Sequence, residues 1–232
     1  MEHYLYLVLN LLCLSYPVYK SFDKRVNYYK NWKNVIVAIF PMLVYMATWD
    51  VIFTNNEVWG FNPKYNISVH FLGLPIEEWM FFICVPFSSL FIYEVVIYYD
   101  KNDVLKKHGR SINILMLLIS SGFIVLGYNQ IYTLVTGVSL LVLLLIHQFI
   151  LKTHNAYLGR FYVAFIFILI PFFAINGILT GAFIPSEVVW YNMKETFGVR
   201  IFTIPFEDIF YCMFMMLLVT TFYEILKKKS LK

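Results

Sequence analysis

The chain has 232 residues, of which 60% are hydrophobic, 20% aromatic and only 14% charged. So apolar a composition excludes an ordinary soluble domain and is typical of an integral membrane protein. The net charge of +4 does not indicate a nucleic-acid partner, and the three cysteines follow no spacing suited to zinc. We therefore expect a membrane protein that binds neither nucleic acid nor a structural metal.

Seven apolar stretches are each close to the length, about 20 residues, that crosses a bilayer as a helix. They cover residues 3–19, 34–54, 79–99, 111–127, 131–151, 161–184 and 208–226. The first is the shortest, but it lacks the basic region and the small-residue cleavage site of a signal peptide, so we count it as a span. The sequence thus predicts an all-α membrane protein with seven transmembrane helices.

Basic residues fall mainly on one side of these spans. Fifteen of the 18 follow the first, third, fifth or seventh span, whereas Lys64, Lys194 and Arg200 lie on the other side. Cytoplasmic loops carry the excess of lysine and arginine in membrane proteins. We therefore expect a multi-pass protein of the cell membrane, with the N-terminus outside and the C-terminus in the cytoplasm.

A proline followed by two acids precedes the third span, as Pro75-Ile76-Glu77-Glu78, and again the seventh, as Pro205-Phe206-Glu207-Asp208. Proline is favoured at the start of a helix, and acids are favoured in its first turn because the unpaired N–H groups and the helix dipole attract negative charge. Each motif is therefore expected at the outer end of a span. One acid would suffice for that effect, so two adjacent acids in both places indicate a chemical role.

The two motifs belong to a longer repeat. Residues 41–94 compared with 171–224, at a fixed offset of 130, give 11 identities in 54 positions, including two prolines and three glutamates. We interpret this as a duplication in which spans one to three correspond to spans five to seven and both halves run in the same direction. The expected units are residues 1–110, a connecting span at 111–130, and residues 131–232.

Parallel halves would bring both motifs to the same boundary, where one composite site can form. Two carboxyls in one low-dielectric place disfavour joint ionisation, which leaves a neutral acid able to donate a proton. The candidate catalytic residues are therefore Glu77, Glu78, Glu207 and Asp208. Candidates for substrate contact are nearby aromatic residues and two polar residues of the second and sixth spans: Trp79, Phe81, Phe82, Phe210, Tyr211, Asp50 and Asn176. For any single ring, ordinary core packing is an equally good explanation.

With the paired motifs, Trp49-Asp50 and the tandem three-span halves, the chain resembles the flavin-independent membrane lycopene cyclases, in the form that fuses both subunits into one polypeptide. The resemblance implies a lipophilic polyene substrate, lycopene, whose ψ-ends are closed to β-ionone rings, by way of γ-carotene to β-carotene, with no net redox change. It implies no cofactor, and no GxGxxG motif for a flavin or nicotinamide follows a strand here. Membrane lipid is the other expected partner, and self-association or contact with other carotenoid enzymes is left open.

The chemistry that the resemblance implies fits the acids. A carboxylic acid protonates C2 of the terminal double bond, the neighbouring double bond attacks the C1 cation, and loss of the C6 proton gives the β-ring. We assign Glu77 and Glu207 as principal proton donors. Glu78 and Asp208 are then partners that keep the donors protonated or accept the departing proton.

Two alternatives stay open. A cyclase that forms an ε-ring, or acts on a different carotene, would carry the same residues, because the site of the final deprotonation decides the ring type. A small proton-coupled transporter would also combine parallel repeats with intramembrane acids. Its polar groups belong near the bilayer midplane, however, whereas these acids gather at one boundary.

Overall fold

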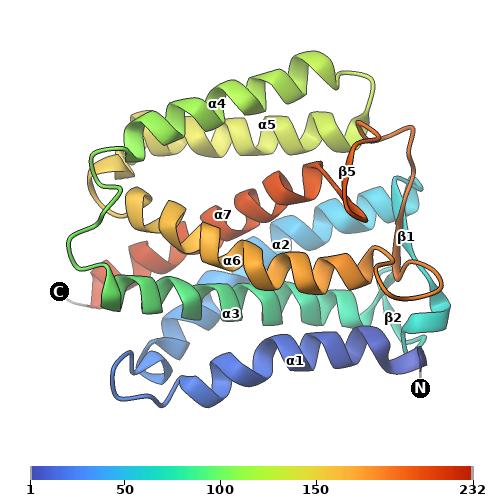
Figure 1. Ribbon diagram of the computed structural model, residues 1–232, viewed down its shortest axis with the longest axis horizontal. Coiled ribbons are helices and arrows are strands. Elements are labelled where there is room, and N and C mark those ends of the chain that lie inside the picture. The colour runs from blue at the N-terminus through green and yellow to red at the C-terminus, as the bar shows by residue number, and fades with distance from the viewer. Residues whose placement is uncertain (1, 231–232) are drawn as a thin grey trace.

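Each apolar stretch of the sequence forms one helix. The computed structural model describes residues 2–230, and its α-helices are α1 (Leu5–Lys20), α2 (Trp32–Asn55), α3 (Ile76–Tyr99), α4 (Gly109–Leu126), α5 (Ile131–Leu145), α6 (Leu158–Leu179) and α7 (Glu207–Ser230). They run side by side along the long axis of the molecule (Figure 1). The prediction of an all-α architecture is confirmed.

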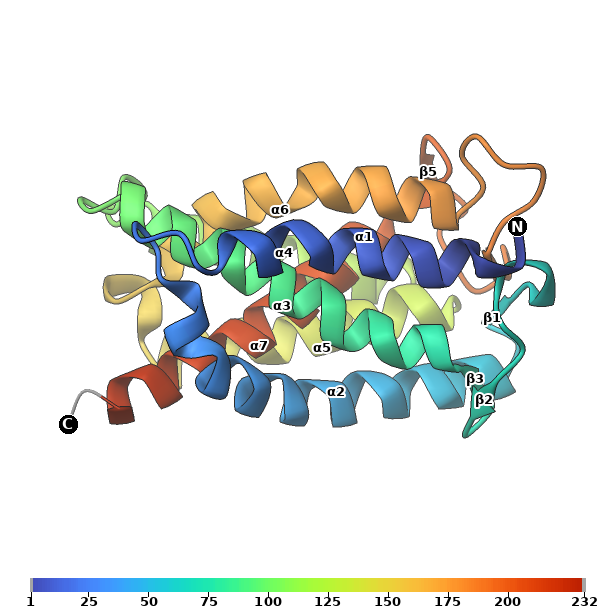
Figure 2. The ribbon, with the colours of Figure 1, turned by 90° about the horizontal axis from the view of Figure 1, so that it is seen from below.

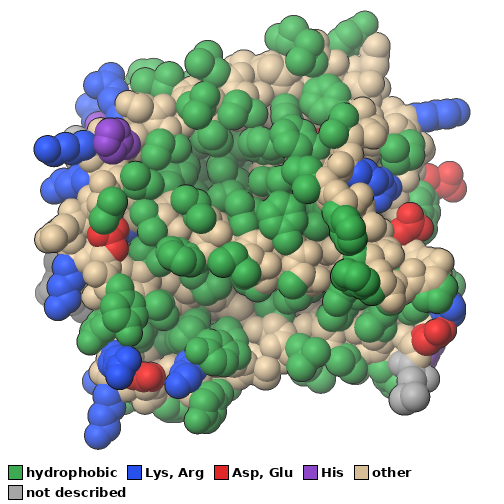
Figure 3. Space-filling model, in the orientation of Figure 1, with side chains coloured by type: hydrophobic (Ala, Val, Ile, Leu, Met, Phe, Trp, Pro, Cys, Tyr) green, Lys and Arg blue, Asp and Glu red, His purple; other side chains and the backbone are tan. Residues whose placement is uncertain are grey.

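Six of these helices, α2 to α7, are long and apolar enough to cross a membrane. The protein is therefore a multi-pass membrane protein. Helix α1 has 16 residues, which at 1.5 Å per residue is about 24 Å, short of the hydrocarbon thickness of about 30 Å. Its place as a seventh span stays a prediction. On the face that Figure 3 shows, hydrophobic side chains cover the middle, and most of the lysine and arginine side chains in view lie at the end that holds the C-terminus.

The two ends of the bundle differ. The strand end is formed by β1 (Trp59–Phe61), β2 (His70–Phe71), β3 (Leu74–Pro75), β4 (Val189–Tyr191), β5 (Arg200–Ile201) and β6 (Ile204–Pro205). Strands β1 and β4 pair antiparallel with Trp59 opposite Tyr191, while β2–β3 and β5–β6 are hairpins. The basic end, at the opposite side, is formed by the loops at 21–31, 100–108 and 151–157 and by Lys227–Lys229. The long connections at the strand end thus cover the starts of α3 and α7.

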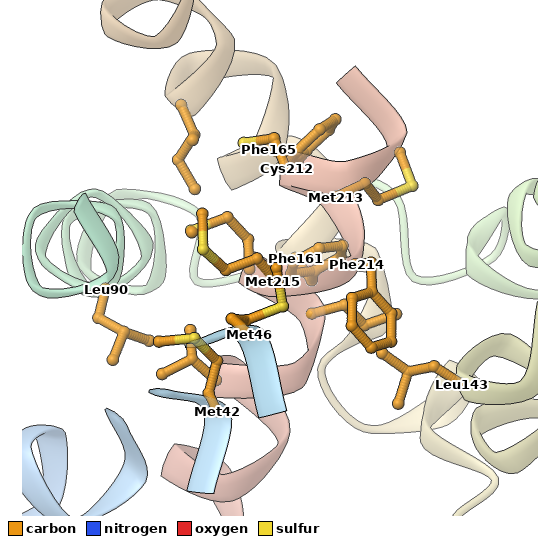
Figure 4. Packing of buried hydrophobic residues seen from close by; sticks show 14 of the residues in the cluster. Met42, Met46, Leu90, Leu143, Phe161, Phe165, Cys212, Met213, Phe214 and Met215 are labelled. Carbon is orange, nitrogen blue, oxygen red and sulfur yellow. The ribbon is translucent and has the colours of Figure 1, made fainter. Parts of the chain in front are cut away.

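The helices pack across the two halves. Helix α2 packs against α7, and α6 packs against α3, so each middle helix contacts the last helix of the other half. Figure 2 shows α1 in front of α3, between α6 and α2. The core between the halves is rich in methionine and phenylalanine (Figure 4), with Met42, Met46, Phe161, Phe165, Met213, Phe214 and Met215 among its buried residues. This apolar core fixes the facing sides of α3 and α7, which carry the acid motifs.

Reciprocal contacts join the two halves. At the basic end, Tyr93 Oη donates to Glu224 Oε1 and Tyr223 Oη donates to Glu94 Oε1, both at 2.8 Å. At the strand end, two backbone hydrogen bonds are reciprocal in the same way: Asn62 N donates to Val188 O (2.8 Å) and Asn192 N donates to Val58 O (2.9 Å). Swapped contacts between positions 130 apart are the pattern expected of a two-fold relation. The duplication itself stays a prediction.

Candidate active site

Both acid motifs lie at helix starts. Helix α3 begins directly after Pro75, with Glu77 and Glu78 in its first turn, and α7 begins at Glu207, with Asp208 next. Although acids at helix starts are commonly exposed, none of these four residues is more than 7% exposed. Buried carboxyls need partners or a function, since their desolvation is costly. Their surroundings therefore decide what each can do.

A narrow chamber of about 50 Å³ lies between the two halves at the strand end. Its polar and aromatic lining comes from α1, α2, α3, α5, α6, α7 and the β1–β4 ribbon: Tyr6, Asp50, Trp59, Phe61, Glu78, Phe81, Tyr132, Phe172, Asn176, Tyr191, Asp208 and Tyr211. Among residues 2–230, no group of three or more His, Cys, Asp or Glu side chains is placed to hold a metal ion. The chamber brings together one acid of each motif, Glu78 and Asp208, with Asp50 and Asn176.

On one side of the chamber, two carboxyls face each other. Glu78 accepts a hydrogen bond from Tyr6 Oη. Asp50 Oδ1 accepts from Trp59 Nε1 at 2.5 Å and from Thr54 Oγ1 at 3.3 Å, while its buried Oδ2 has no hydrogen-bond partner among the described residues. The carboxyls of Asp50 and Glu78 are close enough to interact electrostatically. Two such groups in a dry place disfavour joint ionisation, so this pair favours a shared proton.

On the other side, Asp208 is surrounded by neutral donors. Tyr132 Oη donates to Asp208 Oδ1 at 2.6 Å, and Asn176 Nδ2 and Tyr191 Oη donate to Oδ2 at 2.8 and 3.0 Å. Burial, followed by the nearby charge of Asp208, raises the pKa of Tyr191 well above 10.0, so its hydroxyl keeps its proton and remains a donor. Three donors to one carboxyl favour the ionised form. The chamber therefore holds two acidic centres that differ in their partners, a pair of carboxyls on one side and a carboxyl with three neutral donors on the other.

Glu77 and Glu207 are placed differently. Glu77 Oε1 accepts from the backbone N–H of Ile67 at 2.7 Å, and Glu207 Oε1 accepts from that of Phe197 at 2.6 Å. Each loop amide lies ten residues before its acid, so both glutamates tie the preceding loop to the helix start. Neither glutamate is part of the chamber lining. The structure therefore places the two expected principal proton donors outside the chamber lining, where their carboxyls bind loop backbone.

The aromatic candidates divide in the same way. Phe81 and Tyr211 line the chamber. Trp79 donates Nε1 to a backbone carbonyl of the β2–β3 hairpin at 3.1 Å, while Phe82 and Phe210 are buried in the hydrophobic core. The structure thus brings two of the five rings to the acids and places the other three outside the chamber lining.

Four chamber residues that donate hydrogen bonds to its acids are missing from the sequence candidates: Tyr6, Trp59, Tyr132 and Tyr191. Tyr6 and Tyr132 lie near the strand end of the first helix of each half, and each bonds the second acid of its motif. They are 126 positions apart, so a comparison at a fixed offset of 130 does not align them. A tyrosine at the second residue of the first helix of each half is the signal that could have identified them.

An apolar groove leads away from the chamber along α1, α3 and α6. It has a volume of about 460 Å³ and shares Phe81 and Phe172 with the chamber. Through Ile92 it continues into a further stretch of about 630 Å³, which reaches Lys20 and Arg25 at the basic end. We call these two stretches together the α1–α3–α6 groove. An acid-lined chamber thus opens into a long apolar path.

Comparison with known protein families places both acid motifs in regions that match a family model. A family model described as Lycopene cyclase matches residues 3–96 and 129–226. Each matched region contains one acid motif, and the segment between the regions contains α4. Comparison with curated proteins and with solved structures gives no match.

Proposed function

The chain belongs to the lycopene cyclase family, and from this premise we propose that it closes the ends of a linear carotene into β-rings by proton transfer. The observation that carries the proposal is the chamber, where three buried carboxyls meet an apolar groove. A hydrocarbon substrate offers no polar group for recognition, so apolar walls must position it. The carboxyls then supply the only chemistry that the reaction needs.

Glu78, which favours a proton beside Asp50, donates it to C2 of the terminal double bond. The resulting C1 cation is attacked by the C5=C6 double bond, which forms the C1–C6 bond and leaves the positive charge on C5. Asp208 then removes the proton from C6, which restores the C5=C6 double bond in a β-ring. One proton enters and one leaves, so the reaction is an isomerisation. General acid–base catalysis of this kind contributes about 10²- to 10⁴-fold.

Aromatic rings beside the acids suit a cationic intermediate. The ring centroids of Trp59 and Tyr132 are 5.1 Å apart, and Tyr211 lies 6.1 Å from Trp59 and 6.2 Å from Tyr132. Aromatic faces attract cations, by about 2 kcal/mol where water is excluded. The faces of these three rings therefore favour the charge that develops on C1 and C5.

This assignment moves the donor role from Glu77 and Glu207 to Glu78. The supporting observation is position, because Glu78 lines the chamber whereas Glu77 and Glu207 bind loop amides. We assign Glu77 and Glu207 instead to holding the loops that cover the chamber. Asp208 keeps the role of proton acceptor that the sequence allowed for it.

We also propose that the chain is a duplicated unit, with the strand end outside the cell and the basic end in the cytoplasm. The reciprocal contacts between positions 130 apart support the duplication. The gathering of lysine and arginine at the end that holds the C-terminus supports the orientation (Figure 3). The transporter alternative gains no support, because the acids lie at one end and the groove below them is apolar.

The test is expression in a bacterium that accumulates lycopene. We expect the red carotene to be converted to orange or yellow cyclised products without any added cofactor, and the rings to be of the β type by chromatography and mass spectrometry. In deuterated water the product should carry label at C2. Unchanged lycopene in cells whose membranes contain the protein would contradict the proposal, and ε-rings would keep the cyclase but require a base near C4 instead of C6.

A further inference from the structure

The chamber is built from equivalent positions of both halves. Five pairs of its lining residues are 130 positions apart: Trp59 and Val189, Phe61 and Tyr191, Glu78 and Asp208, Phe81 and Tyr211, and Val85 and Met215. A site with this pseudo-symmetry would be served by two equivalent grooves, one along α1, α3 and α6 and one along α5, α7 and α2. In the structure, the path along α1, α3 and α6 is an open groove, whereas aromatic side chains pack on the other path.

On the path along α5, α7 and α2, aromatic side chains of α2 and α7 pack against one another. The ring of Tyr45 lies 5.2 Å from that of Phe214, and the ring of Trp49 lies 6.1 Å from the same phenylalanine. The residues at the equivalent positions in the second half are Ile175 for Tyr45 and Leu179 for Trp49. These smaller side chains line the open groove and the chamber. The open groove that leads to the chamber therefore lies on the α1–α3–α6 side.

The groove has the length of an extended carotene. On α3, Glu78 lines the chamber and Tyr99 lines the basic end of the groove. The two residues are 21 positions apart, which corresponds to about 31 Å of helix. This is close to the hydrocarbon thickness of about 30 Å and to the length of an extended C40 polyene. With one end group in the narrow chamber, the other end would lie near Lys20 and Arg25, far from any of the three carboxyls.

We propose that the α1–α3–α6 groove holds the rest of the polyene, so that the protein closes one ring per binding event and does not recognise the far end. This inference rests on the proposed function and deepens it by naming the substrate class: extended polyenes with one free ψ-end, whether the other end is open, cyclised or hydroxylated. A second ring requires release of the monocyclic product and its return in the reverse orientation.

The experiment combines a groove-blocking variant with two lengths of substrate. Ile92 lines both stretches of the groove and lies 14 residues beyond Glu78, or about 21 Å along the helix. In Ile92→Trp we expect kcat/KM for a linear C40 carotene to fall about tenfold or more, as overpacking commonly does. A ψ-ended polyene shorter than about 20 Å, which ends above the block, should react as in the wild type. The matched control is Ile83→Trp on the same helix, where the side chain is 47% exposed.

Wild-type protein should also convert a carotene with one ring already closed about as fast as the linear one. Equal losses for short and long polyenes in Ile92→Trp, with Ile83→Trp unaffected, would overturn the inference, because the substitution would then damage the chamber itself. Refusal of the monocyclic carotene by protein that cyclises the linear one would overturn it as well. No ring formation from any polyene by the wild type would instead overturn the proposed function, and the assigned occupant of the groove with it.

Discussion

The pairs Glu77-Glu78 and Glu207-Asp208 occupy equivalent positions, and comparing them separates anchoring from chemistry. In both pairs the first acid bonds a loop amide ten residues before it, and the second acid lines the chamber. The second acids differ in their partners, since Glu78 faces the carboxyl of Asp50 while Asp208 receives three hydrogen bonds from neutral groups. This difference in partners is the reason that we assign the two carboxyls opposite proton-transfer tasks, as in other acid–base pairs.

Helix geometry explains why each motif has two acids. Neighbouring residues on an α-helix point about 100° apart, because a turn takes 3.6 residues. Of two adjacent acids, only one can therefore face the chamber while the other faces the loop. The anchoring position is glutamate in both motifs, whereas the chamber-facing position is glutamate in one motif and aspartate in the other. The position that varies is the one to which we assign different roles.

The sharpest way to test this comparison is to change the two acids of the first pair separately. Glu78→Gln removes the dissociable proton and should lower ring formation by about 10²- to 10⁴-fold, the usual contribution of a general acid. Glu77→Gln keeps an oxygen for the Ile67 amide but places an NH₂ group in a buried position without a partner, which costs about 1–3 kcal/mol in the free energy of unfolding. Turnover per folded molecule should remain. Rates are measured in membranes and normalised to the amount of protein.

Limited proteolysis of the loop at 62–74 separates the two effects. Glu77→Gln should be cleaved faster than the wild type, and Glu78→Gln should not. If Glu77→Gln lost ring formation as completely as Glu78→Gln while its loop stayed protected, the anchoring role would be refuted and the donor would be Glu77.

The second pair should differ from the first in its products. Asp208→Asn removes the base, so we expect a loss of about 10²-fold or more and, in the residual product, rings from deprotonation at other carbons. Glu78→Gln should leave the ring type unchanged, because it acts before the cation forms. Chromatography of the residual carotenes makes the distinction, and Glu207→Gln is the control, expected to keep both rate and ring type. Identical product patterns in Asp208→Asn and the wild type would argue against Asp208 as the base.

The sequence predicts the helices, the helix-start position of the acids and their gathering at one end, because hydrophobic length and local helix preferences determine these features. It does not predict which acid of each pair faces the chamber. That depends on the rotation of α3 and α7, which is fixed by the packing of α6 on α3 and of α2 on α7. A rotation of α3 by the angle between neighbouring residues, about 100°, would exchange the positions of Glu77 and Glu78.

The aromatic and hydroxyl groups of the chamber are harder still to predict. Trp59 and Tyr191 lie in loop strands that pair across 132 positions, and nothing local in either loop indicates the partner. Tyr6 and Tyr132 bond equivalent acids. Their positions differ by 126, however, so a comparison at the fixed offset of 130 places them about one helical turn apart. Identifying these two tyrosines as equivalent requires superposing the two halves in three dimensions. A comparison of the sequences at a fixed offset does not align them.

The smallest expected effect tests the donors around Asp208. Tyr191→Phe removes one of three hydrogen bonds to that carboxyl, and the loss of one bond to a charged group should lower turnover roughly tenfold. Tyr65→Phe is the matched control, since its hydroxyl contacts Ser186 at the strand end, outside the chamber lining. Because burial raises the pKa of Tyr191 well above 10.0, its hydroxyl stays protonated, and the ratio of wild-type to Tyr191→Phe rates should be constant between about pH 6 and 9. A ratio that approaches one as the pH rises would show that Tyr191 ionises in this range, and the hydroxyl could not then be the donor that keeps Asp208 ready to accept the C6 proton.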